Sequence, residues 1–194
     1  MKAAFDNSFL TLALARKGAA SVPKAIELVD DLIEKLETKK AKVIIPTPTL
    51  TEVLLKAPKS GPSYLEKLKS YSCFQIKPFD EKAAIELAET LIASVGRKRG
   101  KKAVSKMKVT FDRQIVAVAK AHGASEMYSD DQEVRSFSEE CGMEAYGFAD
   151  LKLSPKQGKL PYEKAEHSVS ISSKTQGGNS EPTEGQAPSE IKTS

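Results

Sequence analysis

The chain has few of the side chains that build disulfide frameworks or zinc sites. Its only cysteines are Cys73 and Cys141, and its only histidines are His122 and His167. Two cysteines so far apart in sequence do not make a disulfide framework or a zinc site, and two histidines exclude a histidine-rich metal site. We therefore expect any metal chemistry in this chain to rest on carboxylates.

Long apolar runs are also absent from the 194 residues. No stretch approaches the roughly 18 apolar residues that cross a bilayer. At the N-terminus, Lys2 is soon followed by Asp6, which does not fit a secretory signal. The hydrophobic share of 40% and the charged share of 29% are typical of a globular protein. These features predict a cytoplasmic protein without a membrane anchor.

The positive charge of the chain is unevenly distributed. The formal net charge is +4, and from Pro155 onward lysines and glutamates balance, so the excess lies before that point. Its densest part is RKRGKKAVSKMK, residues 97–108, which contains no acid. Such a segment is typical of proteins that bind phosphate backbones, although a solvated loop has the same composition. Its cationic residues are Arg97, Lys98, Arg99, Lys101, Lys102, Lys106 and Lys108.

Short apolar segments alternate with helical patterns in the first three quarters of the chain. Strands are expected at residues 1–5, 42–46, 73–77, 127–129 and 144–148. Helices are expected at residues 9–16, 21–40, 47–58, 62–71, 81–96, 111–123 and 131–140, with Asp80 and Thr110 as N-caps of two of them and Gly18 and Gly123 ending two. This alternation predicts an α/β fold with a mainly parallel sheet.

The composition changes at about Ser154. The segment that follows is rich in Ser, Gly, Pro, Gln, Thr and Glu and has few large apolar residues. Such a segment cannot bury enough surface to offset its chain entropy. We therefore expect one globular domain at residues 1–153 and a disordered, low-complexity tail at residues 154–194.

Four carboxylates are expected at the edge of the sheet where strands end and the following helices begin. Asp6 ends the first strand, and Asp131 follows the strand that ends near Ser129. Glu52 and Asp112 are expected in the first turns of their helices. Ligands of parallel α/β sheets bind at this edge. If the four side chains converge, their all-oxygen site suits Mg²⁺ or Mn²⁺ better than zinc.

Each of these acids also has a structural interpretation. Asp6 could cap a helix, and Thr-Leu-Thr-Glu at residues 49–52 fits a capping box that uses Glu52. Asp112 and Asp131 would be favoured by the positive end of a helix dipole. Converged carboxylates would raise one another's pKa values unless a divalent cation were bound. Composition and spacing alone leave the two interpretations open.

The segments FDNSF, TLTEVL, TFDRQIVAVAKAHGA and YSDDQEV resemble the PIN-domain nucleases, among them the VapC-like toxins of bacterial toxin–antitoxin pairs. The resemblance spans residues 1–153 and is most specific at residues 110–131. It implies a PIN-like three-layer sandwich, in which helices flank a short-stranded, mainly parallel central sheet. It also implies metal-binding, catalytic roles for Asp6, Glu52, Asp112 and Asp131, with Ser8 and Ser129 as supporting residues. Asp130 is the alternative to Asp131 as the metal ligand, although the Ser-x-Asp spacing favours Asp131.

The activity that this resemblance implies is that of an Mg²⁺- or Mn²⁺-dependent ribonuclease. Water is the nucleophile in such enzymes, and no covalent enzyme intermediate forms. The cationic residues of 97–108 are our candidates for RNA contact. By the same resemblance, a homodimer and a small antitoxin protein are the expected partners.

Two other functions remain open at this level. A haloacid-dehalogenase-type phosphatase also begins with an Asp after its first strand, but it needs a second acid two residues later, where this chain has Ser8. A catalytically weak or silent module that binds RNA or protein would have the same fold. Such a module would keep its RNA affinity without metal, whereas a nuclease would need metal to cleave.

Overall fold

The computed structural model describes residues 1–16, 22–94 and 106–154. All of them belong to the compact unit Met1–Pro155. The elements, in chain order, are β1 (Lys2–Phe5), α1 (Asn7–Ala15), α2 (Ala25–Thr38), β2 (Lys42–Pro46), α3 (Thr47–Lys56), η1 (Pro58–Ser60), α4 (Gly61–Ser70), β3 (Phe74–Lys77), α5 (Glu81–Ser94), α6 (Lys106–Ala121), β4 (Glu126–Tyr128), α7 (Gln132–Glu140), β5 (Glu144–Tyr146) and η2 (Phe148–Asp150). The predicted tail beyond Ser154 and the predicted helix end at Gly18 lie outside the described residues.

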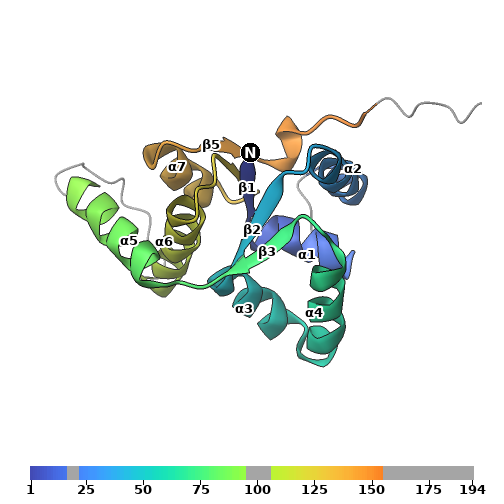
Figure 1. The fold of residues 1–194 in the computed structure, drawn as a ribbon, viewed down its shortest axis with the longest axis horizontal. Coiled ribbons are helices and arrows are strands. Elements are labelled where there is room, and N and C mark those ends of the chain that lie inside the picture. Colours follow the sequence, from blue (N-terminus) through green and yellow to red (C-terminus); the bar gives the residue numbers. More distant parts are fainter. Residues whose placement is uncertain (17–21, 95–105, 155–194) are drawn as a thin grey trace, which may run out of the picture. The chain divides into compact units, whose positions relative to one another are not determined.

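The five strands form one sheet in the order β3-β2-β1-β4-β5, and every neighbouring pair is parallel (Figure 1). In the register, Lys2 pairs with Lys42 and Phe5 pairs with Tyr128. Strand β1 lies at the centre of the sheet. Strands β2 and β3 follow on one side of β1, and β4 and β5 follow on its other side. The strand order therefore reverses between β1 and β4, and parallel α/β sheets commonly bind their ligands at such a point.

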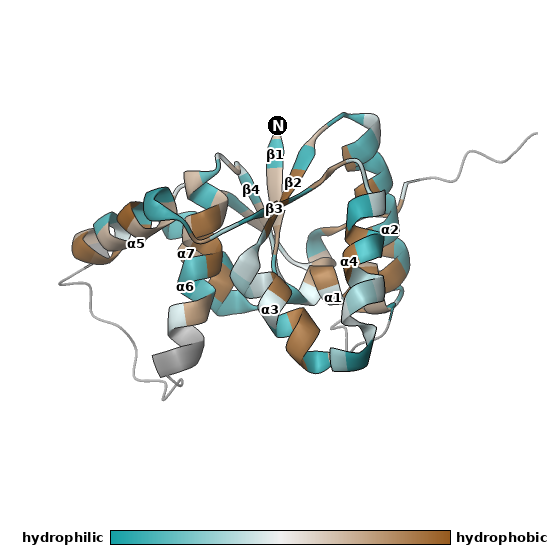
Figure 2. Cartoon of the chain, turned by 60° about the horizontal axis from the view of Figure 1, so that its bottom comes forward, coloured by the Kyte–Doolittle hydropathy of each residue, from teal (hydrophilic) through white to brown (hydrophobic). Residues whose placement is uncertain are grey.

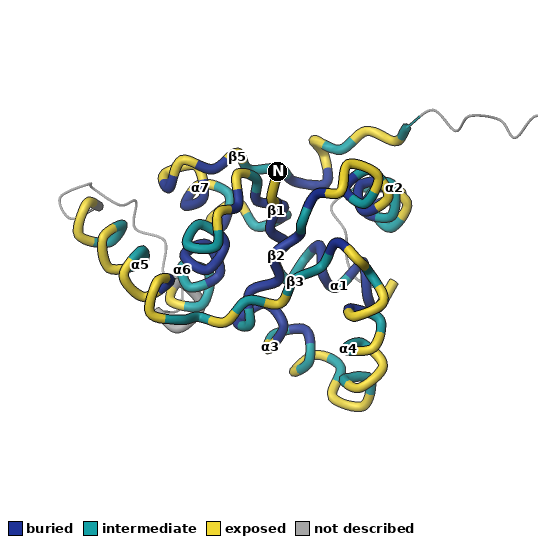
Figure 3. Tube along the Cα trace, viewed as in Figure 1, coloured by how far each residue is buried: buried dark blue, intermediate teal, exposed yellow. Residues whose placement is uncertain are grey.

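Helices cover both faces of the sheet, which makes three layers and confirms the predicted fold class. Ala3 and Phe5 of β1 join a core with residues of α1 and α2, whereas Ala4 joins a second core with residues of α6 and α7. The central strands are buried on both sides, as is usual for parallel sheets (Figure 3). Hydrophobic and hydrophilic residues alternate around α2, α4 and α6, the pattern of amphipathic helices (Figure 2). Within the described ranges, no helix is long and apolar enough to span a membrane.

Two predicted helix ends are confirmed at the residues that cap them. Asp80 Oδ1 accepts a hydrogen bond from the Ala83 N–H at 3.0 Å, at the start of α5. Gly123, at φ +81°, closes α6 while the Ala124 N–H donates to the Ala119 carbonyl. A left-handed glycine with this hydrogen bond is a common helix C-terminus.

Several predicted boundaries are wrong, and the reason is clear for three of them. Helix α1 begins at Asn7 rather than Phe9, because Asp6 caps it. Helix α6 begins at Lys106, so Thr110 lies inside it and is not its N-cap; Lys and Met favour the helical state and extend it toward the N-terminus. Strand β5 ends at Tyr146, because the Gly147 N–H donates to the Asp150 carboxylate and the chain turns into η2.

The predicted capping box at residues 49–52 does not form. Helix α3 already begins at Thr47, with Pro48 in its first turn, and its N-cap residue, Pro46, has no side chain that could accept a capping bond. Proline is favoured in the first helical turn because its missing N–H has no intrahelical partner there. Thr49 is left fully buried, and its hydroxyl has no hydrogen-bond partner within the described part of the chain.

Thr49→Val is expected to stabilise the protein by about 1 kcal/mol, because it removes a buried hydroxyl without changing the shape of the side chain. Thr47→Val is the matched control, since the Thr47 hydroxyl accepts a hydrogen bond from the Phe79 N–H at 3.3 Å. The control should destabilise. Thermal unfolding of the two variants measures both effects, and a destabilised Thr49→Val would show that its hydroxyl is bonded.

Candidate functional site

Asp6 lies at the carboxyl end of β1, beside the point where the strand order reverses. Its N–H donates to the Tyr128 carbonyl at 3.1 Å, which extends the ladder between β1 and β4 by one residue. Its Oδ1 caps α1 by accepting from the Ser8 and Phe9 N–H groups at 2.8 and 3.3 Å. The side chain is almost completely buried, with 4% exposed. The structural interpretation of Asp6 as an N-cap is therefore confirmed, and it does not exclude a ligand role.

Two serine hydroxyls connect Asp6 to the loop after β4. Ser129 Oγ donates to Asp6 Oδ2 at 2.5 Å, and Ser8 Oγ donates to Oδ1 at 2.6 Å. Each hydroxyl also accepts a backbone N–H: that of Asp131 on Ser129 at 3.0 Å, and that of Asp130 on Ser8 at 2.9 Å. The ends of β1 and β4 are therefore joined by a small hydrogen-bond network.

Burial dominates the electrostatics of Asp6. Removal from water raises its pKa to about 6, although the hydrogen bonds from Ser129, Ser8 and Phe9 act in the opposite direction. Within the described ranges, no cationic side chain forms an ion pair with this carboxylate. An ionised Asp6 at neutral pH is thus a buried negative charge that a bound cation would stabilise.

Asp131 is the N-cap of α7. Its Oδ1 accepts a hydrogen bond from the Glu133 N–H at 2.8 Å. The prediction that Asp131 lies at the N-terminus of a helix is therefore also confirmed. Asp130 and Asp131 are both partly buried. Their backbone N–H groups, bonded to Ser8 and Ser129, fix the loop that carries the two carboxylates beside Asp6.

Glu52 and Asp112 lie one turn further along their helices than predicted. Because α3 begins at Thr47 and α6 at Lys106, each acid is in the second turn rather than the first. The two helices contact each other, and both acids are partly buried. Among residues 1–16, 22–94 and 106–154, however, no three His, Cys, Asp or Glu side chains are grouped closely enough to hold a metal ion. The convergence of all four acids stays a prediction.

The predicted RNA-binding segment is only partly covered by the structure. Residues 97–105 lie outside the described residues. Lys106 and Lys108 are in the first turn of α6. Because α6 ends at the amino side of β4, this first turn is directed toward the other end of the strands, where Asp6 lies.

One residue that contacts the loop was not anticipated from the sequence. Arg135, at the end of the first turn of α7, donates through Nη1 to the Ser129 carbonyl at 2.8 Å and through Nη2 to Gln132 Oε1 at 2.7 Å. No sequence signal points to the contact with Ser129, because its acceptor is a backbone carbonyl.

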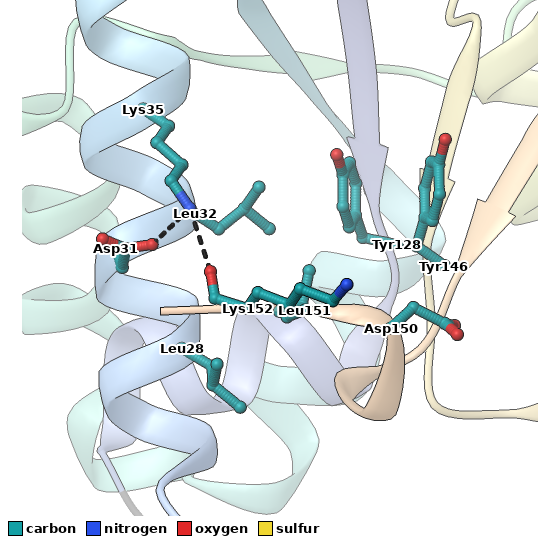
Figure 4. A pocket seen from close by; sticks show the side chains of 9 residues that line it. All are labelled: Leu28, Asp31, Leu32, Lys35, Tyr128, Tyr146, Asp150, Leu151 and Lys152. Carbon is teal, nitrogen blue, oxygen red and sulfur yellow. Dashed lines mark hydrogen bonds and ion pairs between the residues drawn. The ribbon is translucent and has the colours of Figure 1, made fainter. Parts of the chain in front are cut away.

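A separate pocket of about 360 Å³ lies between α2 and the strands β4 and β5 (Figure 4). Two of its charged side chains are already engaged: Lys35 forms an ion pair with Asp31 at 2.6 Å and also donates to the Lys152 carbonyl at 3.0 Å. Neither the four predicted acids nor the two serines line it. The residues that do are Leu28, Asp31, Leu32, Lys35, Tyr128, Tyr146, Asp150, Leu151 and Lys152.

Comparisons with known proteins give a likeness in fold only. No protein-family model matches the chain, and no curated protein matches it. The solved structure of VapBC2 from Rickettsia felis, bound to a promoter DNA fragment, has a TM-score of 0.51 at 15% identity and covers 76% of this chain and 98% of that one. DNA-bound VapBC from Salmonella typhimurium has a TM-score of 0.49 at 18% identity, with the same coverage. The Mycobacterium tuberculosis toxin VapC20, which cleaves the sarcin–ricin loop, has a TM-score of 0.42 at 15% identity, covering 69% of this chain and 93% of that one.

Proposed function

We propose that this chain is a divalent-metal-dependent endoribonuclease that hydrolyses RNA phosphodiesters with water as the nucleophile. The observation that carries the proposal is the buried Asp6 carboxylate, which Ser8 and Ser129 connect to the Asp130–Asp131 loop where the strand order of the sheet reverses. The fold, which the Rickettsia felis VapBC2 structure shares, and the sequence resemblance to PIN-domain nucleases support it further.

The donor chemistry of this edge fits Mg²⁺ or Mn²⁺. Asp6 is a buried carboxylate whose pKa is raised to about 6 by burial, and hard divalent cations prefer such oxygen ligands. Asp6, Glu52, Asp112 and Asp131 would hold the ion, with Asp130 as the alternative to Asp131. When bound, the ion would acidify water and neutralise the charge that develops on the phosphate.

The two serines position the Asp6 carboxylate, which would hold the ion. Ser8 and Ser129 each donate to a different oxygen of Asp6, so the carboxylate is held in one rotamer with its plane fixed. A carboxylate oxygen has two acceptor directions, and Oδ2 accepts only from Ser129 in the described part of the chain. Oδ2 is therefore the oxygen of Asp6 that can take a further ligand.

The proposed biological role is that of the toxin of a toxin–antitoxin pair. The similar Rickettsia felis structure is a VapBC complex, so a small antitoxin is the proposed protein partner of this chain, beside the RNA substrate and a second copy of the chain in a homodimer. Association with an antitoxin would keep the nuclease inactive until it is released.

A binding module without catalysis is the second candidate, and one observation favours it. No group of three potential metal ligands occurs within the described ranges. RNA cleavage and RNA binding by the purified chain with Mg²⁺, with Mn²⁺ and with EDTA separate the two functions. A nuclease cleaves only with metal, whereas a module binds RNA equally well in EDTA and never cleaves it.

Neutralising the basic segment at residues 97–108 is expected to flatten the dependence of RNA affinity on salt. Each cation that contacts a phosphate should contribute about 0.7 to the slope of log K against log salt for single-stranded RNA. Changing its seven cationic residues to Gln and titrating RNA at several salt concentrations measures the effect. Lys39→Gln with Lys40→Gln, at the amino end of β2, is the control. An unchanged slope in the variant would show that the segment does not contact RNA.

A further inference from the structure

We propose that Arg135 is a positioning residue of the proposed nuclease site, which fixes the loop of Ser129, Asp130 and Asp131 against Asp6. Its guanidinium group donates to the Ser129 carbonyl, so it acts on Asp6 through the backbone of Ser129. The catalytic part of this inference rests on the proposed function, whereas the positioning itself can be measured in the protein without metal or RNA.

Arg135 holds both ends of the turn between β4 and α7. Nη1 donates to the carbonyl of Ser129, the first residue after β4, and Nη2 donates to Gln132 Oε1, on the first residue of α7. A guanidinium group suits this task because its donors lie in one rigid plane. The guanidinium group therefore bridges the end of β4 and the first side chain of α7.

Ser129 is the residue through which this restraint reaches Asp6. It is fully buried, and all its polar groups are engaged: the N–H donates to the Tyr146 carbonyl at 2.9 Å, the carbonyl accepts from Arg135, and Oγ donates to Asp6. Without Arg135, the carbonyl would lose this partner, and the hydroxyl would lose its fixed direction toward Asp6. The Asp131 N–H, which donates to the same hydroxyl, would be released with it.

Gly147 gives independent support, because it leaves room for the guanidinium group. A Cβ atom at this position would lie 2.8 Å from Arg135 Nη1 and 3.3 Å from Cζ. The backbone of Gly147, at φ −97° and ψ 179°, is extended and open to any residue. Glycine is therefore favoured here for steric reasons. The space that its missing Cβ leaves is occupied by the Arg135 guanidinium group, whose Nη1 donates to the Ser129 carbonyl.

The geometry also yields a variant that moves Arg135 without replacing it. Gly147→Ala should displace the guanidinium group, which is the far end of a flexible side chain, at little cost to the fold. Gly61→Ala is the matched control, since a Cβ there would meet only Leu54 Cδ2 at 3.4 Å, an ordinary contact in a helical residue. Arg135→Met removes the donors, and Arg135→Lys keeps the charge but not the planar fork.

The test is amide hydrogen exchange of Asp130 and Asp131 in the metal-free protein, followed by RNA cleavage kinetics. In Arg135→Met and Gly147→Ala the two amides should exchange about tenfold faster, as expected for the loss of one hydrogen bond. Core amides such as that of Ile44, and all amides in Gly61→Ala, should keep their wild-type exchange rates.

In RNA cleavage, we expect kcat of Arg135→Met and Gly147→Ala to fall about 10- to 100-fold with KM unchanged, because the loop orients reacting groups rather than binding substrate. Arg135→Lys should restore part of both losses.

Unchanged exchange of Asp130 and Asp131 in both variants would overturn the inference, as would a KM that rises while kcat stays constant. If the wild type cleaves no RNA, the proposed nuclease function fails while the exchange rates still decide the positioning role. The two failures are thus distinguishable.

Discussion

Asp6→Asn is expected to stabilise the metal-free protein at neutral pH by up to about 3 kcal/mol while removing its nuclease activity. Burial raises the pKa of Asp6 from 3.8 to about 6, so the ionised carboxylate is unfavourable in the folded chain. Asn carries no charge and keeps a carbonyl oxygen that can accept the capping bonds of α1. Its NH2 group would replace Oδ2, so the Ser129 hydroxyl would have to accept there instead of donating, which is why about 3 kcal/mol is an upper bound. The residue therefore opposes stability, as expected if it serves a cation.

The sign of the pH dependence follows from this raised pKa. Between about pH 4 and pH 6 the folded state binds the Asp6 proton more tightly than the unfolded state, so the stability of the wild type falls as the pH rises through this window. Below this pH window the carboxyl group is protonated in both the folded and the unfolded state, so Asp6→Asn does not raise the free energy of unfolding. Above the window, the difference in the free energy of unfolding between Asp6→Asn and the wild type is constant and at its maximum.

Urea unfolding of both proteins in EDTA, at several pH values from 3.5 to 8, measures this difference. Asp31→Asn is a control of opposite sign. Burial alone would raise the pKa of Asp31, but the bonds from Lys35 and Ser154 outweigh it and hold this pKa below its usual value. Asp31→Asn should thus destabilise at neutral pH, and the loss should vanish in acid. If the difference in the free energy of unfolding between Asp6→Asn and the wild type did not change with pH, this would contradict the raised pKa of Asp6.

The fold could be predicted because its signals are local. Buried apolar segments such as residues 42–46, alternating with amphipathic helices such as residues 25–38, indicate a parallel sheet covered on both faces, and the structure has one. The errors lie at element ends, where a single hydrogen bond decides the boundary. Asp6 extends α1 by two residues, and the Gly147–Asp150 bond ends β5 early.

The candidate site was only partly predictable. Asp6, Ser8 and Ser129 meet as expected, because two adjacent parallel strands end there. Arg135 could not be inferred, since it acts on a backbone carbonyl, which has no signature in the sequence. Asp112 was one turn off, because the start of its helix was assigned to Thr110, which lies inside α6. The first-turn position of Glu52 depended on the capping box at residues 49–52, which does not form.

The central claim is that the carboxylates at this edge of the sheet serve a nuclease, and Asp112→Asn tests it. The substitution is expected to reduce metal-dependent RNA cleavage by about 100-fold or more, the usual loss when one electrostatic element of an active site is removed. Glu133→Gln, which replaces an exposed acid of the neighbouring helix α7, should cleave like the wild type.

The measurement is cleavage of labelled RNA by the wild type and these two variants, each folded and free of any inhibitor, with Mg²⁺, with Mn²⁺ and with EDTA. The account predicts cleavage by the wild type and Glu133→Gln with metal, none in EDTA, and almost none by Asp112→Asn. Equal cleavage by Asp112→Asn, or no cleavage by the wild type under any of these conditions, would contradict it.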